Sequence, residues 1–159
     1  MQELDLEKQT MELIPIKQLL EDNVELTSNP SYREIIDMTV AFYQRVGFSP
    51  PWIGYFVRHN DEIVACVGFK GKPLEGTVEI AYGTFENFRQ KGMGTAACKL
   101  LIDVALKTDP LMRVTARTLP ENNFSTRILE KNNFKCLGVI QDPEDGPVWE
   151  WEYQGNKWH

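Results

Sequence analysis

Alternating apolar and polar residues predict a series of β-strands along the chain. The clearest alternation lies at 77–85, where Val78, Ile80 and Tyr82 share one face of a strand and Glu79 lies on the other. Aromatic and β-branched residues on either side of the turn at 59–61 indicate a hairpin. The expected strands cover residues 11–14, 53–58, 62–70, 77–85, 113–118, 134–140 and 148–153.

Apolar residues at helical spacing predict helices between these strands. One helix follows the Asn29-Pro30 start signal, runs from Tyr32 and ends at Gly47. A brief helix is expected at 16–20, ending near Asp22 and Asn23. A longer one is expected at 93–107, with this buried stripe: Met93, Ala97, Leu100, Leu101 and Val104.

The last predicted helix precedes the C-terminal hairpin. Ser125 is its expected N-cap, Ile128 and Leu129 are its apolar contacts, and Asn132 and Asn133 can end it in a left-handed conformation. In chain order, the pattern gives one strand, helices, three antiparallel strands, a helix, a strand, a helix and a hairpin. It predicts an α/β fold with a mixed, mostly antiparallel sheet flanked by helices, in one domain covering 1–159.

Composition limits the possible classes of function. The chain has 159 residues, of which 42% are hydrophobic, enough for one sizeable core. No apolar run approaches the roughly 20 residues of a membrane span, and the acidic start is unlike a secretory signal, so we expect a cytoplasmic protein. Cys66, Cys98 and Cys136 are far apart and are expected to be buried free thiols. With only His59 and His159, neither a metal site nor a histidine triad is expected.

Charge argues against nucleic acid as a partner. The formal net charge is −6 at pH 7, and the basic residues are scattered rather than gathered in a stripe. An acidic surface would attract amines or basic peptides, although the simpler interpretation is that the charge keeps the protein soluble.

A basic, glycine-containing turn is the strongest chemical signal. It is Arg89-Gln90-Lys91-Gly92-Met93-Gly94, between the strand at 77–85 and the helix at 93–107. A helix start offers free N–H groups and a positive dipole end, and glycine lets an anion approach closely. By itself the pattern also fits a plain strand-to-helix connection. A Walker nucleotide site is not supported, because Gly94 is followed by Thr95 and not by Lys-Ser or Lys-Thr. A Rossmann dinucleotide site is not supported either, because no G-x-G-x-x-G is present.

Two separated blocks resemble the GNAT acetyltransferase superfamily. The first joins 78–84 to 88–94 and is similar to the fourth strand and the acyl-CoA pyrophosphate loop of that family. The second, 122–125 with 129–134, is similar to the N-x-x-S and L-E-K-x-G-F signature of the branch that includes ribosomal-protein N-acetyltransferases. Asn133 replaces the usual glycine, and Leu129 stands where many relatives carry a tyrosine general acid.

The resemblance implies a binding site for acetyl-CoA. It places the donor in a V-shaped split between the strands at 77–85 and 113–118, with the backbone of Tyr82, Gly83 and Thr84 along the pantetheine arm. Asn122 would bond the pantetheine, and Ser125 would either assist or only cap its helix. The pyrophosphate would be held by the loop and helix start, comprising Arg89, Gln90, Lys91, Gly92, Met93, Gly94 and Thr95.

The resemblance also implies direct acetyl transfer to a primary amine. The amine must lose a proton, and Glu79 is the candidate base, unless it is only a solvent-facing or ion-paired glutamate. Tyr82 or backbone N–H groups would stabilise the oxyanion. A non-catalytic acyl-CoA-binding or sensor module is the alternative, which the leucine at 129 favours. The acceptor, a small molecule or a protein amine, is left open, as is the choice between monomer and homodimer.

Other conspicuous side chains have simpler explanations. Trp52, Tyr55 and Phe56 could line a substrate pocket, but aromatic residues on a strand are more often core. The segment 23–30 could shape substrate entry or be an ordinary loop. The acidic turn at 142–145 lacks the ligand spacing of a calcium loop.

Overall fold

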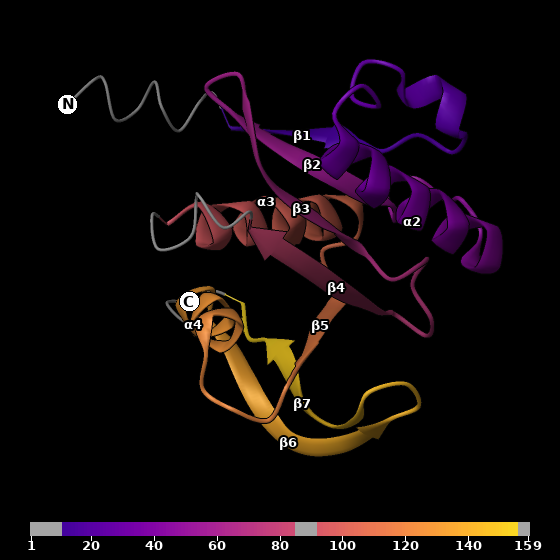
Figure 1. The fold of residues 1–159 in the computed structure, drawn as a ribbon. Helices are drawn as coiled ribbons and strands as arrows, with labels where there is room; N and C mark the ends of the chain where they lie inside the picture. Colours follow the sequence, from indigo (N-terminus) through magenta and orange to yellow (C-terminus); the bar gives the residue numbers. More distant parts are fainter. Residues whose placement is uncertain (1–10, 85–91, 156–159) are drawn as a thin grey trace.

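The strands form one twisted sheet. The computed structural model describes residues 11–84 and 92–155, apart from the side chain of Thr84. Its sheet has seven strands in the order β1-β2-β3-β4-β5-β7-β6 (Figure 1). They are β1 (Glu12–Pro15), β2 (Gly54–His59), β3 (Glu62–Phe69), β4 (Thr77–Thr84), β5 (Arg113–Thr118), β6 (Phe134–Asp142) and β7 (Gly146–Tyr153). All neighbours are antiparallel except β4 and β5, which confirms the predicted mixed sheet.

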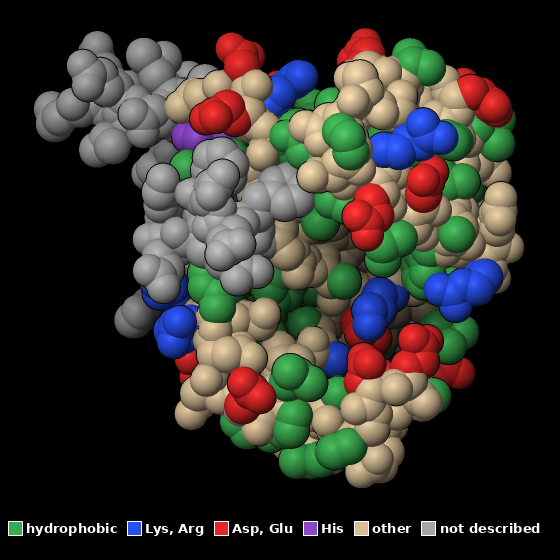
Figure 2. Space-filling view, viewed as in Figure 1, with side chains coloured by type: hydrophobic (Ala, Val, Ile, Leu, Met, Phe, Trp, Pro, Cys, Tyr) green, Lys and Arg blue, Asp and Glu red, His purple; other side chains and the backbone are tan. Residues whose placement is uncertain are grey.

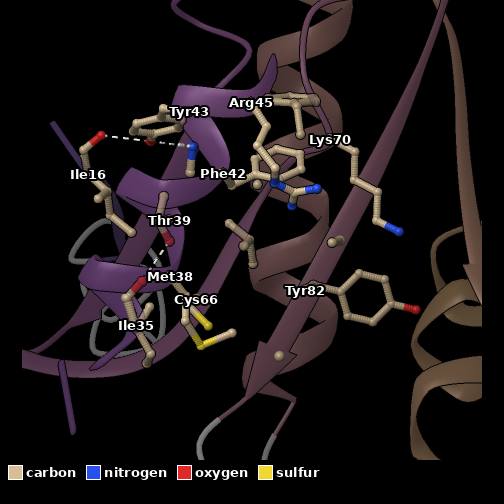
Figure 3. A pocket seen from close by; sticks show the side chains of 16 residues that line it. Ile16, Ile35, Met38, Thr39, Phe42, Tyr43, Arg45, Cys66, Lys70 and Tyr82 are labelled. Atoms are coloured by element: carbon tan, nitrogen blue, oxygen red, sulfur yellow. Dashed lines mark hydrogen bonds between the residues drawn. The ribbon is translucent and has the colours of Figure 1, made fainter. Parts of the chain in front are cut away.

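The helices lie on both faces of this sheet. They are η1 (Leu20–Asn23), α2 (Pro30–Val46), α3 (Met93–Thr108) and α4 (Phe124–Lys131). Figures 1 and 3 show α2 and α3 on opposite sides of β3 and β4. Tyr43 fixes α2 in place, because its hydroxyl donates to the Ile16 carbonyl at 2.7 Å and accepts from the Gly54 N–H at 2.9 Å. Burial raises the pKa of this hydroxyl to about 12, so it stays neutral.

The core lies mainly between α3 and the sheet. Leu101 of α3, Val114 of β5 and Leu129 of α4 are each at most 1% exposed. Burying a side chain of this size stabilises the fold by about 1.5–3 kcal/mol. The predicted apolar stripe of α3 packs against the core: Ala97 and Leu101 are fully buried, and Met93, Leu100 and Val104 are partly buried against the core. The residues of α3 that are buried are Gly94, Ala97, Cys98, Leu101, Ile102 and Ala105.

The predicted split lies in the middle of the sheet. β4 and β5 pair from Thr77 and Arg113 as far as Ile80 and Ala116. Beyond that point β4 continues on β3 and β5 continues on β7. Consecutive strands that stop pairing leave backbone groups unused at their facing edges, and such an edge can accept an added strand. The V-shaped split between these two strands is confirmed.

Asn123, rather than Ser125, caps α4. The Asn123 side chain accepts from the Thr126 N–H at 3.0 Å, and the Thr126 hydroxyl accepts from the Asn123 N–H at 2.8 Å. This reciprocal capping box starts the helix two residues earlier than the predicted cap. The predicted end is confirmed, since Asn133 has φ 65°. Asn132 donates to the Thr95 carbonyl at 3.1 Å and so joins α4 to the start of α3.

Several smaller predictions have mixed outcomes. The brief helix predicted from Ile16 begins later than expected, at Leu20 as η1, and its predicted end near Asn23 is confirmed. Asn23 bonds the backbone of Lys17 and Leu19, where the helix was expected to start. All three cysteines are free, but only Cys98 is fully buried. The aromatic pair Tyr55 and Phe56 belongs to the core as predicted.

No helix within 11–84 and 92–155 is long and apolar enough to cross a bilayer.

Candidate active site

A cavity of about 260 Å³ occupies the split between β4 and β5. We call it the split cavity. In Figure 2 the molecule is hollowed between the half that carries α2 and the half that carries β6 and β7, and hydrophobic side chains floor the hollow. The split cavity is lined by Lys70, Ile80, Ala81, Tyr82, Arg117, Thr118, Leu119, Asn123 and Ser125. Its position at an unpaired strand edge suits a narrow, extended ligand.

A second cavity of about 270 Å³ lies where α3 begins, and we call it the helix-start cavity. Gly92 has φ 78°, and a Cβ built on it would meet no atom within 4 Å. The first N–H groups of α3 and the positive end of its dipole lie at this cavity. The helix-start cavity is lined by Gly92, Gly94, Thr95, Phe124, Arg127, Ile128 and Lys131.

The two cations of this cavity come from α4. Arg127 and Lys131 are four residues apart and so lie on the same side of the helix. The Asn132 bond to Thr95 holds this end of α4 against the start of α3. The start of a helix and two cationic side chains thus border one cavity, an arrangement that suits a multiply charged anion such as a diphosphate.

A third cavity of about 440 Å³ lies between α2 and the sheet, and we call it the α2 cavity. Most of its surface is apolar. It is lined by Ile16, Ile35, Met38, Thr39, Phe42, Tyr43, Arg45, Gly54, Cys66, Val67, Gly68, Phe69, Lys70, Ala81, Tyr82 and Gly83 (Figure 3).

The split cavity and the α2 cavity meet at β4. Lys70, Ala81 and Tyr82 line both of them. A ligand in the split and a second ligand under α2 would therefore come into contact at this point. Bringing two reactants together in a fixed orientation is a large part of the work of a transferase.

Tyr82 crosses from β4 to α4. Its hydroxyl donates to the Ser125 carbonyl oxygen at 2.9 Å. Burial, and to a smaller extent the charge of the Cys98 thiolate, raises the pKa of Tyr82 above its usual value. Tyr82 is therefore a neutral phenol at physiological pH and acts as a hydrogen-bond donor.

Glu79 lies next to this meeting point but not in it. Its carboxylate is 3.0 Å from the Lys70 ammonium and 3.9 Å from the Arg117 guanidinium, and its side chain is 21% exposed. Lys70 is among the described residues that line the two cavities, whereas Glu79 is not. The Glu79 carboxylate is therefore ion-paired with Lys70, which lines both cavities, without lining either cavity itself.

Arg117 connects this region to the C-terminal hairpin. Its guanidinium bonds Asp142 at 2.9 Å and Glu150 at 3.1 Å. The pKa of Asp142 falls to about 2, chiefly because it accepts the N–H groups of Glu144 and Asp145, and next because of Arg117. These contacts hold one wall of the split cavity in place.

The remaining predicted site residues occupy different positions. Gly83 and Thr84 lie at the end of β4, beyond the last residue that pairs with β5. Met93 is half-buried at the start of α3. Asn122 is exposed, while its neighbour Asn123 lines the split cavity. Arg89, Gln90 and Lys91 lie outside the described residues. No group of three or more His, Cys, Asp or Glu residues with metal-binding geometry occurs within 11–84 and 92–155.

Sequence reasoning missed Arg127 and Lys131. A basic pair spaced four residues apart, directly after the asparagine cap, is the only local signal for them. Such pairs are common on solvated helix faces, so the signal acquires meaning only when α4 is placed beside the start of α3.

Comparison with known proteins identifies the family. Residues 12–135 match the acetyltransferase (GNAT) domain. The uncharacterized N-acetyltransferase YjdG of Bacillus subtilis (strain 168) is 35% identical over 125 residues, which are 78% of this chain and 68% of that protein.

Solved structures show the same fold. A ribosomal L7/L12 alpha-N-protein acetyltransferase, RimL, superposes with a TM-score of 0.67 and 16% identity, over 90% of this chain and 92% of that one. The Microcin C7 self immunity acetyltransferase MccE, in complex with acetyl-CoA and AMP, gives a TM-score of 0.64 and 18% identity over 90% and 91%. The chain belongs to the GNAT family of acetyl-CoA-dependent acyltransferases.

Proposed function

We propose that this protein transfers the acetyl group of acetyl-CoA directly to the nitrogen of a primary amine. One observation carries the proposal: the split cavity and the α2 cavity meet at Lys70, Ala81 and Tyr82. A thioester held in the split and an amine held under α2 would be in contact there, as direct transfer requires.

The donor would extend from the split cavity to the helix-start cavity. The pantetheine arm would lie along Tyr82, Gly83 and Thr84 as an added strand. Its diphosphate would lie at the start of α3, on the amides of Gly92 to Thr95, with Arg127 and Lys131 as further cations. The contacts predicted for Arg89, Gln90, Lys91 and Asn122 stay predictions. The bound acetyl-CoA in MccE, a protein of the same fold, supports this choice of donor.

The chemistry would consist of attack, collapse and two proton transfers. The neutral amine attacks the thioester carbonyl carbon, a C–N bond forms and a tetrahedral oxyanion results. Backbone N–H groups of β4 or the Tyr82 hydroxyl would stabilise that oxyanion, and Tyr82 would first release the Ser125 carbonyl. The C–S bond then breaks, and CoA leaves as a thiolate that takes up a proton.

Glu79 would accept the proton that the amine loses. The carboxylate lies behind Lys70, so the proton would reach it through a water molecule. Leu129 supplies no acid, because its hydrocarbon side chain has no ionisable proton, and it is buried in the core. The leaving thiolate would therefore be protonated by solvent or by the Glu79 carboxyl.

Binding and turnover would be tested in one experiment. Acetyl-CoA at 100 times its Kd stabilises a folded protein by about 2.7 kcal/mol, so the Tm should rise by several degrees. Release of free thiol on adding a panel of amines should then report transfer. A Tm that does not change at millimolar acetyl-CoA would contradict the proposal, while binding without turnover by any amine would favour the sensor alternative.

Three organisational expectations are carried forward with this proposal. That 1–159 is a single catalytic domain stays a prediction, and so do a cytoplasmic location and a monomeric or homodimeric state.

A further inference from the structure

We infer that the acceptor is a small primary amine that carries an apolar body and an anionic group, with the anionic group bound by Arg45. The inference rests on the proposed function and specifies its acceptor. It is carried by the shape, lining and charge of the α2 cavity.

The size of the cavity suits a small molecule. A volume of about 440 Å³ lies within the range of roughly 300–1,000 Å³ that is usual for small-molecule sites. Its floor consists of small side chains on β3 and β4, namely Cys66, Gly68, Ala81 and Gly83. A Cβ built on Gly83 would meet no atom within 4 Å, so the floor is open at this residue.

The walls suit an apolar body. Ile35, Met38 and Phe42 project from α2 over the small residues of the floor (Figure 3). Met38 is 67% exposed, so its side chain is available to cover a ligand. Burying apolar ligand surface here would supply most of the binding free energy.

The charges of the cavity are cationic. Arg45 and Lys70 line it, and none of the described lining residues is Asp or Glu. Lys70 is already paired with Glu79. A ligand with several positive charges would be repelled by such a lining, and a negative group would be attracted.

Arg45 is the cation that remains for a ligand. Its guanidinium carbon lies 5.3 Å from the centre of the Phe42 ring, and Figure 3 shows the group reaching from α2 into the space above β3 and β4. Among the described residues it forms no ion pair with a carboxylate. A planar guanidinium close to an aromatic ring suits a carboxylate, phosphonate or sulfonate.

The position of Arg45 sets the direction of the ligand. Ala81, Tyr82 and Gly83 on the sheet side belong to the donor strand, and Arg45 lies on the α2 side. An acceptor with its anionic group on Arg45 would therefore direct its amine toward β4. The net charge of −6 suggests basic partners, but the local charge of this cavity has the opposite sign.

The test uses matched amines with acetyl-CoA and follows thiol release. L-phenylalanine and its phosphonate analogue carry the apolar body and an acid, phenethylamine lacks the acid, and glycine lacks the body. Spermidine and a short peptide with a free N-terminus represent the competing acceptor classes. We expect the acidic aromatic amines to have kcat/KM values about tenfold or more above those of phenethylamine, because a charged hydrogen-bonded pair is lost in the latter.

Arg45→Met tests the assigned contact. It should raise the KM for L-phenylalanine about tenfold or more while leaving the KM for phenethylamine and the acetyl-CoA Tm shift unchanged. Arg33→Met is the matched control on the same helix, because Arg33 pairs with Asp37 and does not line the cavity. The control should leave all three measurements as in the wild type.

The outcomes separate this inference from the proposed function. If acetyl-CoA binds but spermidine or the peptide is the best acceptor, or if Arg45→Met affects both aromatic amines equally, the inference is wrong and the function stands. If no amine reacts, L-phenylalanine added with CoA must still shift the Tm of the wild type more than it shifts the Tm of Arg45→Met. Equal Tm shifts in the two proteins overturn the inference. Failure of acetyl-CoA itself to bind contradicts the proposed function instead.

Discussion

The helix-start cavity and the α2 cavity would recognise their proposed ligands by different means. The first is built from backbone N–H groups, a glycine in the left-handed region and two cations. The second is built from apolar side chains over a floor of small residues. Backbone recognition depends on a short local motif, whereas side-chain recognition depends on residues that come from α2, β3 and β4. With the two sites built so differently, one fold could keep its donor site while its acceptor site changes.

The largest expected effect concerns the backbone site. Gly92→Val should abolish the acetyl-CoA Tm shift, because the side chain would fill the anion site and a valine with φ 78° is strained by about 1–2 kcal/mol. Gly76→Val is the matched control, since Gly76 has φ 76° and equally open surroundings but lies outside the cavity. If Gly76→Val binds acetyl-CoA normally and Gly92→Val does not, the loss of binding is assigned to the helix-start cavity. Retained binding in Gly92→Val would show that the anion lies elsewhere.

The next effect concerns the junction of the split cavity and the α2 cavity. Glu79→Gln should lower kcat about 100-fold and leave the Kd for acetyl-CoA unchanged, because it removes a base without altering the donor site. Glu152→Gln is the control: both glutamates are 21% exposed on the side chain and each pairs with a cation. An equal loss of kcat in the two variants would mean that Glu79 has a structural role only.

Gly83→Val should act on the acceptor alone. The added side chain would project into the open floor of the α2 cavity, while the β4 backbone would remain available to the donor. We expect KM for the best acceptor to rise about tenfold, the discrimination that a pocket gives against excess bulk. The Tm shift produced by acetyl-CoA should be the same as in the wild type at each concentration. Weaker binding of acetyl-CoA with an unchanged KM for the acceptor would contradict the assignment of the α2 cavity to the acceptor.

Arg127→Met should act on the donor alone, with a smaller effect. Arg127 is exposed, so its loss should raise the Kd for acetyl-CoA about fivefold, and the wild-type Kd should rise with salt more steeply than that of the variant. Lys107→Met, at the opposite end of α3, is the charge-matched control. Calorimetric titration at two salt concentrations would measure both slopes, and identical slopes would remove Arg127 from the donor site.

The smallest effect concerns the wall of the split cavity and stability rather than either ligand. The folded-state pKa of Asp142 is lowered from 3.8 to about 2, so its stabilisation is fully present above about pH 4 and is lost as the pH falls toward 2. Asp142→Asn should therefore be less stable than the wild type at neutral pH, and the difference should shrink over that window. Urea unfolding at several pH values, with Asp145→Asn as control, measures it. A constant difference across pH would contradict the assigned pKa.

The sequence predicted the sheet better than the contacts around it. The alternation from Thr77 onward placed β4 correctly, because successive side chains of a strand point to opposite faces and the apolar ones face the core. The cap of α4 was misplaced because Ser125 and Asn123 are both good caps, and only the bond between Asn123 and Thr126 distinguishes them. The start of the short helix was misplaced for a similar reason, since the Asn23 side chain bonds the backbone of Lys17 where the helical turn was expected.

By itself the sequence determined the order of strands and helices, the GNAT resemblance and the glycine turn before α3. All of these are local patterns, set by the φ/ψ preferences and periodicity of neighbouring residues. Only the tertiary structure decided that Arg127 and Lys131 face the start of α3, that Glu79 is paired with Lys70, and that Arg45 reaches into an apolar cavity. These contacts join segments far apart in the chain. No local pattern encodes them, because the packing of whole helices against the sheet sets which side chains meet.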